Sequence, residues 1–226
     1  MSNYIIVINQ KNLKSKNSLY DNTFLNKLTD IVISNKNFVG INKFIRDMFY
    51  LKCIDEYDIA LNKNIVGYEN DYQLFIDVYN LFKEYKPYEI YDLGFFRGFF
   101  LELLSYKYLK NLYEEESIYR ESKIKIGEYE SHYWDIIINK EEVLKLYECK
   151  FSSKSIKRSH LDKMFGLQNK LIQSKVYLVT FELKDLVWDD LKGLINNTNQ
   201  EKFESILNSF NYMFLEDYVI KNPFDN

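Results

Sequence analysis

Two short runs of the sequence place charged residues inside otherwise apolar, strand-like stretches. Asp135 follows Trp134 and precedes three isoleucines, while Glu148 and Lys150 flank Cys149. Side chains alternate along a strand, so Glu148 and Lys150 share one face of their strand. Charges in such surroundings are costly to bury unless they are paired or bind a metal ion. The pattern therefore predicts a functional site that contains Asp135, Glu148 and Lys150.

These residue types suit phosphodiester hydrolysis assisted by a divalent cation. Two carboxylates on adjacent strands, helped by a backbone carbonyl, form the oxygen-rich site that Mg²⁺ or Mn²⁺ prefers. Such a cation polarises a phosphate and activates water, and Lys150 can orient that water or offset charge in the transition state. If the hairpin turns at residues 141–142, Asp135 lies opposite Glu148; a one-residue slip would move Asp135 to the wrong face. The competing interpretation is an Asp135–Lys150 ion pair on a solvated sheet face.

A further carboxylate, Glu102, lies within a very apolar helical stretch. Residues 95–113 predict a helix that is apolar almost all round, and such helices are buried on several sides. Gly98 stands one turn before Glu102 and leaves room for a close approach. A carboxylate there needs a partner, and a metal ion or its bound water would serve. An ion pair with Arg97 or Lys107 is the alternative.

The elements expected around these residues follow the order helix, three strands, helix, strand. After the helix at 95–113 we expect strands at 123–130, 132–139 and 143–151, a helix at 159–174, a strand at 176–182, and helices at 183–196 and 200–217. This order predicts an α/β fold with a mixed central sheet flanked by helices.

The first part of the chain predicts mostly helices. A short strand at 4–8 precedes apolar residues at three-to-four spacing up to about residue 86. Pro87 interrupts that pattern, and a short strand is predicted at 88–93. We therefore expect a mostly helical accessory region over residues 1–87 and an α/β domain over residues 88–226.

Residues 95–182 resemble the core of the PD-(D/E)XK, or restriction-endonuclease-like, nuclease superfamily, whose order is helix, three-stranded meander, helix and strand. The resemblance implies that Glu102 corresponds to the family's helix glutamate and Asp135 to its metal-binding aspartate. Glu148 and Lys150 correspond to its E-x-K pair. Cys149, between them, would contribute only its backbone carbonyl to the metal.

This resemblance implies a metal-dependent nuclease with Mg²⁺ or Mn²⁺ as cofactor, an endonuclease for which DNA is the favoured substrate and RNA the alternative. Residues 88–226 would form the nuclease-like domain, with Glu102, Asp135, Glu148 and Lys150 as catalytic residues. Many such nucleases pair two active sites to cut two strands, so a homodimer is one possible arrangement. The chain departs from the family's Pro-Asp form in having Trp134, and no glycine pair follows the second helix, so no subfamily is assigned.

Basic residues after the E-x-K pair predict contacts with nucleic acid. Residues 140–175 carry nine basic and four acidic groups in a chain of net charge −3, an electrostatic footprint typical of phosphate binding. The N–H groups at the start of the helix expected from 159 also favour phosphate. The candidates are Lys154, Lys157, Arg158, His160, Lys163 and Gln168. A solvated helix face is the alternative, and His160 could instead be structural or act as a general acid or base.

Cysteine content and hydropathy indicate the cellular setting. Two cysteines, Cys53 and Cys149, argue against a disulfide framework, and two cysteines with two histidines show no zinc-ligand spacing. No apolar run approaches the ~20 residues that span a bilayer, and the first residues do not resemble a signal peptide. We expect a cytoplasmic protein without a membrane partner.

Two other functions stay open: a non-catalytic nucleic-acid-binding or assembly protein on the same fold, and a structural α/β scaffold whose charges form ion pairs.

Overall fold

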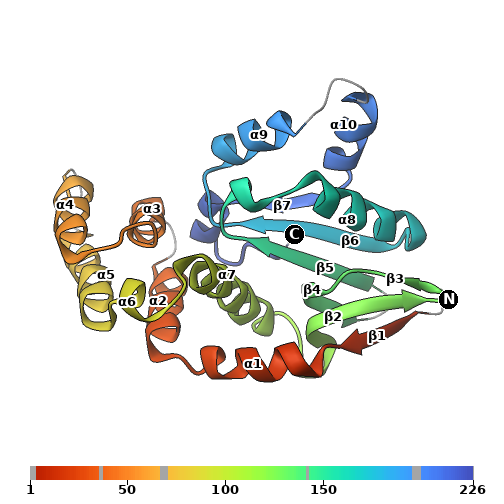
Figure 1. The fold of residues 1–226 in the computed structure, drawn as a ribbon, viewed down its shortest axis with the longest axis horizontal. Helices are drawn as coiled ribbons and strands as arrows, with labels where there is room; N and C mark the ends of the chain where they lie inside the picture. Colours follow the sequence, from red (N-terminus) through yellow and green to blue (C-terminus); the bar gives the residue numbers. More distant parts are fainter. Residues whose placement is uncertain (1–3, 36–37, 67–70, 141–142, 195–199, 226) are drawn as a thin grey trace.

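A single mixed β-sheet with helices on both faces forms the centre of the computed structural model, which describes residues 4–35, 38–66, 71–140, 143–194 and 200–225 (Figure 1). The strands of this seven-stranded sheet are β1 (Ile5–Ile8), β2 (Ile118–Ile126), β3 (Tyr129–Glu130), β4 (Trp134–Lys140), β5 (Val143–Lys150), β6 (Ser174–Thr180) and β7 (Asn211–Met213). The α/β fold with a mixed sheet flanked by helices is thereby confirmed.

The helices of the described residues alternate with these strands only in the second half of the chain. They are α1 (Gln10–Tyr20), α2 (Thr23–Ser34), α3 (Val39–Met48), α4 (Ile54–Asn64), α5 (Tyr72–Tyr85), α6 (Pro87–Ile90), α7 (Leu93–Lys110), α8 (Arg158–Lys170), α9 (Lys184–Gly193) and α10 (Gln200–Asn208). The predicted short strand followed by helices is therefore confirmed for the first part of the chain.

Strand order fixes where the candidate residues lie. The sheet runs β1-β2-β4-β5-β6-β7, with β3 paired to β2; pairs up to β4–β5 are antiparallel, whereas β5–β6 and β6–β7 are parallel. In the β4–β5 hairpin Lys140 pairs with Val143 and Ile136 with Tyr147. This is the register expected for a turn at 141–142, residues that lie outside the described part. The pairing of β4 with β5 begins at Ile136 and Tyr147, one residue short of Asp135 and Glu148.

The two faces of the sheet bury different helices. Tyr147 and Cys149 of β5, together with Phe151 directly after the strand, pack with α7, as alternation predicts. Leu144 and Leu146 point to the other face, into the cluster that includes the buried residues of α8. The sheet is thus covered on both sides, and alternation along β5 places Glu148 and Lys150 on the face of α8, near the end of the strand.

Helix α7 is apolar almost all round because it is surrounded by protein. Its start is defined by Asp92, whose carboxylate accepts a hydrogen bond from the Phe95 N–H at 3.1 Å. One side of the helix packs against β4 and β5, and another packs against α2. The predicted burial on several sides is confirmed, and Glu102 is held among these packed surfaces.

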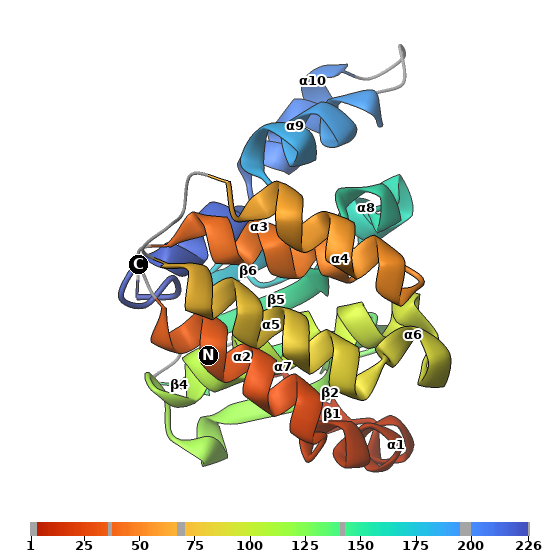
Figure 2. The ribbon, with the colours of Figure 1, turned by 90° about the vertical axis from the view of Figure 1, so that its left-hand side faces the viewer.

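The N-terminal helices share this core with the sheet, and α2 to α5 stand together beside α7 in Figure 2. Phe49, directly after α3, has its ring 5.2 Å from that of Phe82 in α5, 5.1 Å from that of Phe100 in α7 and 5.4 Å from that of Phe151 after β5. Strand β1 also belongs to the sheet, through its pairing with β2. The division at residue 87 falls between α5 and α6 and stays a prediction.

Three predicted elements differ from the structure. Residues 88–93, predicted as a strand, form most of α6 and the start of α7, because Pro87 is preorganised for a helix N-terminus and Asp92 caps the next helix. The helix predicted over 200–217 ends at Asn208, because the chain turns there to pair β7 with β6. The strand predicted at 123–130 is divided into β2, which begins at Ile118 and ends at Ile126, and the short β3, which pairs with it.

Candidate metal centre

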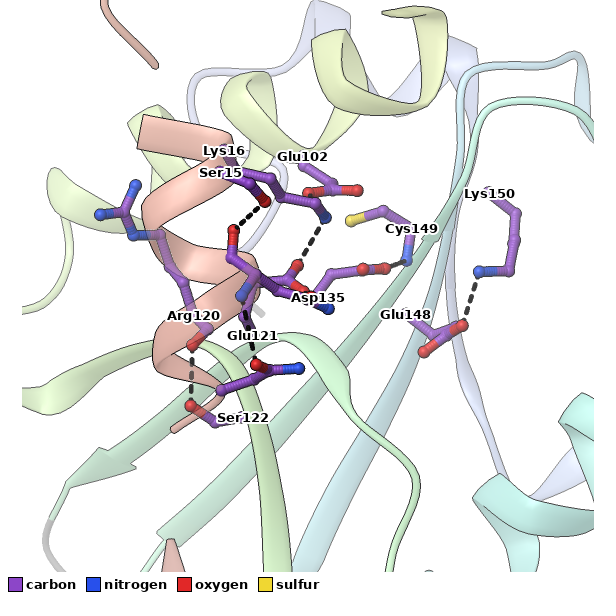
Figure 3. Close-up of polar contacts among 12 residues, drawn as sticks. Ser15, Lys16, Glu102, Arg120, Glu121, Ser122, Asp135, Glu148, Cys149 and Lys150 are labelled. Atoms are coloured by element: carbon purple, nitrogen blue, oxygen red, sulfur yellow. Dashed lines mark hydrogen bonds and ion pairs between the residues drawn. The ribbon is translucent and has the colours of Figure 1, made fainter. Parts of the chain in front are cut away.

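Three carboxylates converge between α7, β2 and β4. Glu102, Glu121 and Asp135 each offer an oxygen, and these oxygens all lie within 4.8 Å of one another. Figure 3 shows the three side chains directed toward a common region from a helix and two strands. The Glu102 and Glu121 side chains are 13% and 7% exposed. An all-oxygen, carboxylate-rich donor set of this kind fits Mg²⁺ or Mn²⁺.

A local break in the sheet turns two of these carboxylates toward α7. Strands β2 and β4 pair at Arg120–Ile136 and at Ser122–Trp134, but Glu121 between them has a positive φ of 49°. The Ser122 hydroxyl donates to the Arg120 carbonyl at 2.8 Å and spans the distortion. Left-handed backbone is unfavourable for a residue with a side chain, and such strain is concentrated at functional sites.

The backbone of β5 borders this cluster. The Cys149 N–H donates to Asp135 Oδ2 at 2.7 Å, so the carboxylate lies beside the Cys149 backbone rather than against the side chain of Glu148. Burial raises the pKa of the Cys149 thiol well above its usual value, as do nearby carboxylates. A neutral, buried thiol is a poor nucleophile and metal ligand, which leaves the backbone as the part of Cys149 near the site.

A lysine from α1 reaches into the cluster. Lys16 Nζ lies 2.7 Å from Glu102 Oε2 and 2.5 Å from Glu121 Oε1. The ion pairs considered for Glu102 from the sequence are not the ones formed. Arg97 stacks over the Tyr50 ring at 4.5 Å, and Lys107 pairs with an aspartate of α2 at 2.7 Å.

Glu148 and Lys150 form a second charged group beside the first. Lys150 Nζ lies 2.6 Å from Glu148 Oε1, and His132 Nε2 lies 3.2 Å from Glu148 Oε2. Glu148 does not belong to the group of carboxylates whose oxygens lie within 4.8 Å, as far as the described residues show. Among the described residues Lys150 pairs with Glu148 and not with Asp135, the partner that the competing interpretation gave it. The role of Glu148 as a metal ligand stays a prediction.

Burial gives these carboxyl groups contrasting acidities. Burial raises the pKa of Asp135 well above its usual value, and the charges of Glu102 and Glu148 raise it further. Burial also raises the pKa of Glu102, which Lys16 only partly offsets. Burial alone would raise the pKa of Glu148 as well, but the bond to His132 and the ammonium of Lys150 lower it below its usual value. Protons thus compete with cations at Asp135 and Glu102.

Lys150 is held as a cation. Burial alone would lower its pKa, but Glu148 and Asp135 raise it above the usual value for lysine. A lysine that stays protonated cannot abstract a proton from water at neutral pH. It can attract a phosphate or offset negative charge that develops on one.

The predicted nucleic-acid contacts lie around the start of α8. Lys154, Lys157 and Lys163 are exposed, so their ammonium groups are available to a ligand. Arg158 is half-buried, with its guanidinium 5.3 Å from the centre of the Phe203 ring.

His160 and Gln168 are less accessible. Burial and the positive charge of Lys150 lower the pKa of His160, so its imidazole is neutral. The Gln168 amide donates to the Ser209 carbonyl at 2.8 Å, which ties α8 to the segment before β7. All six assignments to nucleic-acid binding stay predictions.

Sequence reasoning missed Glu121, Lys16 and His132. Glu121 falls in the polar run Arg-Glu-Ser-Lys, which carries no strand signal, and its position depends on the break between β2 and β4. Lys16 is one of several lysines in a polar helix far away in the sequence. No signal in the sequence indicated that His132 contacts Glu148.

Comparisons with known proteins add little. No protein-family model and no curated protein matches the chain. A solved structure, protein VC1899 from Vibrio cholerae, is similar with 14% sequence identity and a TM-score of 0.47 over 96% of this chain and 57% of that one. The chain therefore spans little more than half the length of that protein.

No helix of the described residues is long and apolar enough to cross a bilayer.

Proposed function

We propose that this protein is a divalent-metal-dependent nuclease of the PD-(D/E)XK class that hydrolyses phosphodiester bonds, with DNA as the first substrate to test. The convergence of Glu102, Glu121 and Asp135 carries the proposal. Support also comes from the order α7, β2, β4, β5, α8, β6, which matches the helix, meander, helix and strand of a restriction-endonuclease-like core.

In this proposal the carboxylates bind the metal ion and Lys150 acts on the phosphate. Glu102, Glu121 and Asp135 would hold Mg²⁺ or Mn²⁺, with the Cys149 carbonyl as a further candidate ligand. The cation, when bound, polarises a phosphate and lowers the pKa of a bound water. Lys150, as a permanent cation, offsets charge on the phosphate, and Glu148 fixes the position of its ammonium at 2.6 Å.

The charge balance of the site favours a cation. Four carboxylates, those of Glu102, Glu121, Asp135 and Glu148, face two ammonium groups, those of Lys16 and Lys150. Burial is the main cause of the raised pKa values of Asp135 and Glu102, and repulsion from neighbouring carboxylates raises both further. A divalent cation would relieve that repulsion.

One observation favours the non-catalytic alternative. Lys16 already compensates Glu102 and Glu121, and Lys150 compensates Glu148, so much of the charge is paired within the chain. A nucleic-acid-binding or assembly protein with a purely structural ion-pair network would look similar in this respect. Cleavage assays separate the two functions.

The test is cleavage of labelled single- and double-stranded DNA and RNA with Mg²⁺, Mn²⁺ or EDTA. We expect metal-dependent cleavage that Asp135→Asn and Lys150→Met each reduce by at least about a hundredfold. The Asp30–Lys107 ion pair on the surface offers matched controls, so Asp30→Asn and Lys107→Met should retain activity. Binding without cleavage in any metal would favour the non-catalytic alternative instead.

A further inference from the structure

The ammonium of Lys16 lies at the place where the carboxylate cluster would hold a cation. It bonds one oxygen each of Glu102 and Glu121, the two glutamates of the cluster, at 2.7 and 2.5 Å. The side chain is only 13% exposed, although it comes from a helix on which no residue is buried. Figure 3 shows it reaching down from α1 into the group of carboxylates.

Lys16 and a divalent cation would compete for these oxygens. Metal–oxygen bonds of about 2.1 Å would bring the ion to the oxygens that Nζ now contacts, and it would stand within a few ångströms of a like charge. Repulsion between cations in a half-buried site is weakly screened. Metal binding therefore favours departure of the ammonium.

The structure allows Lys16 to leave without unfolding its helix. A lysine has a flexible four-carbon stem, so its ammonium can swing out to solvent. Helix α1 has other attachments: the Asn9 N–H donates to the Glu121 carbonyl at 2.8 Å, and the Tyr20 ring packs edge-on against that of Phe99 at 4.8 Å.

We infer that Lys16 is a resident counter-ion of the carboxylate cluster, which a divalent cation displaces when it binds. The chain thereby sets its own metal affinity: an internal ammonium keeps the site compensated at low metal concentration and yields to the metal at high concentration. This inference rests on the proposed metal site. It concerns the regulation of that site rather than the reaction.

Chemical labelling of the natural protein tests the displacement directly. The protein is treated with an amine-reactive ester with and without Mn²⁺, and modification of each lysine is followed by mass spectrometry. We expect Mn²⁺ to increase the labelling rate of Lys16 about tenfold or more, while exposed Lys14 on the same helix reacts equally in both conditions. Mn²⁺ binding with Lys16 still protected would overturn the inference.

Calorimetric titration of Mn²⁺ into two variants gives an independent measurement. Lys16→Met removes the ammonium and keeps an apolar stem, so we expect tighter Mn²⁺ binding by about tenfold. Lys14→Met removes a charge on the same helix at a distance from the carboxylates and should change affinity by less than about twofold. Equal affinity of Lys16→Met and the natural protein would contradict the displacement.

These outcomes separate the inference from the proposed function. Displacement of Lys16 by Mn²⁺ without cleavage of any nucleic acid would refute the nuclease and leave the inference standing. Metal-dependent cleavage with Lys16 protected throughout would do the opposite. Absence of Mn²⁺ binding in both the natural protein and Lys16→Met would refute both.

Discussion

Asp135 and Glu148 lie just beyond the part over which the neighbouring strands β4 and β5 pair, and their carboxyl groups have different partners. Asp135 accepts from the Cys149 N–H and faces two other carboxylates. Glu148 lies between Lys150 and His132. One carboxyl group is therefore pushed toward its neutral form, and the other is held as a carboxylate.

Substitution of Asp135 by asparagine should stabilise the protein. The raised folded-state pKa means that the free energy of unfolding decreases as the pH rises from the ordinary value of 3.8 through the folded pKa. An asparagine has no charge to bury and can still accept from Cys149. We expect Asp135→Asn to raise Tm at pH 7 by a few degrees, about 1 kcal/mol, with a smaller gain in acid. Thermal unfolding at several pH values measures this, and a lower Tm at pH 7 would refute it.

Glu148→Gln should have the opposite effect. Its lowered pKa contributes stability above the ordinary value of 4.5, and that contribution is lost as the pH falls through the folded pKa. The substitution also leaves the half-buried ammonium of Lys150 without its partner. We expect a loss of about 1–3 kcal/mol at pH 7 that diminishes below pH 4.5. Urea denaturation at pH 7 and near pH 4 provides the comparison, and a pH-independent loss would contradict this explanation.

Individual site residues were predictable to different degrees. Asp135, Glu148 and Lys150 stand out because charge is rare inside apolar strands, and Glu102 because it interrupts an apolar helix. Lys16 and Glu121 give no such signal, because both lie in polar runs where another charge is unremarkable. Their role depends on where α1 and the distorted part of β2 lie in the folded chain.

At the scale of elements, the central hairpin was the most predictable part. The sequence left the register of β4 and β5 open, and the pairing of Lys140 with Val143 agrees with the register expected for a two-residue turn. Strand β7 was missed because its three residues, Asn211–Met213, form a strand only through pairing with β6. Apolar, β-prone residues at 88–93 were overridden by proline and by an aspartate cap.

The start of α8 should contribute salt-dependent binding of nucleic acid. Lys154 and Lys157 are exposed where the chain enters the helix, on the same side of the sheet as Lys150. If both contact phosphates, their replacement by alanine lowers the slope of log affinity against log salt by about 2. Fluorescence anisotropy with labelled DNA in EDTA, repeated over a range of salt concentrations, measures that slope.

Two lysines on α9 serve as the control for this prediction. Lys184 and Lys192 are equally exposed, so Lys184→Ala with Lys192→Ala removes the same net charge from another surface. We expect little change in slope for that pair. Equal losses for the two double variants would indicate a general charge effect and not a binding surface.

At the scale of the whole molecule, the helical first part and the sheet share one apolar core. The ring of Phe49 contacts aromatic rings of α2, α5 and α7 and that of Phe151 directly after β5. Regions joined by such packing are expected to unfold together, whatever their separate functions. The helices of the first part thus bear on the stability of the candidate site.

Phe49→Ala tests this coupling. Loss of a fully buried phenylalanine costs about 3–5 kcal/mol. Both tryptophans, Trp134 and Trp188, lie in the second half of the chain, so their fluorescence reports unfolding of the sheet and α9. We expect the urea midpoint from fluorescence to fall together with that from circular dichroism. An unchanged fluorescence midpoint with loss of helical signal would instead indicate two independently folding units divided near residue 87.

The central claim is that Glu102, Glu121 and Asp135 form a divalent-metal site for phosphodiester hydrolysis, and Glu121 provides its most direct test. Nicking of a circular plasmid in Mn²⁺ is compared for the natural protein, Glu121→Gln and Glu130→Gln. Glu130 serves as the control because it is exposed and lies in β3, which pairs with β2. We predict Mn²⁺-dependent nicking that Glu121→Gln abolishes and Glu130→Gln retains. Undiminished nicking by Glu121→Gln, or no metal-dependent nicking by the natural protein, would contradict the account.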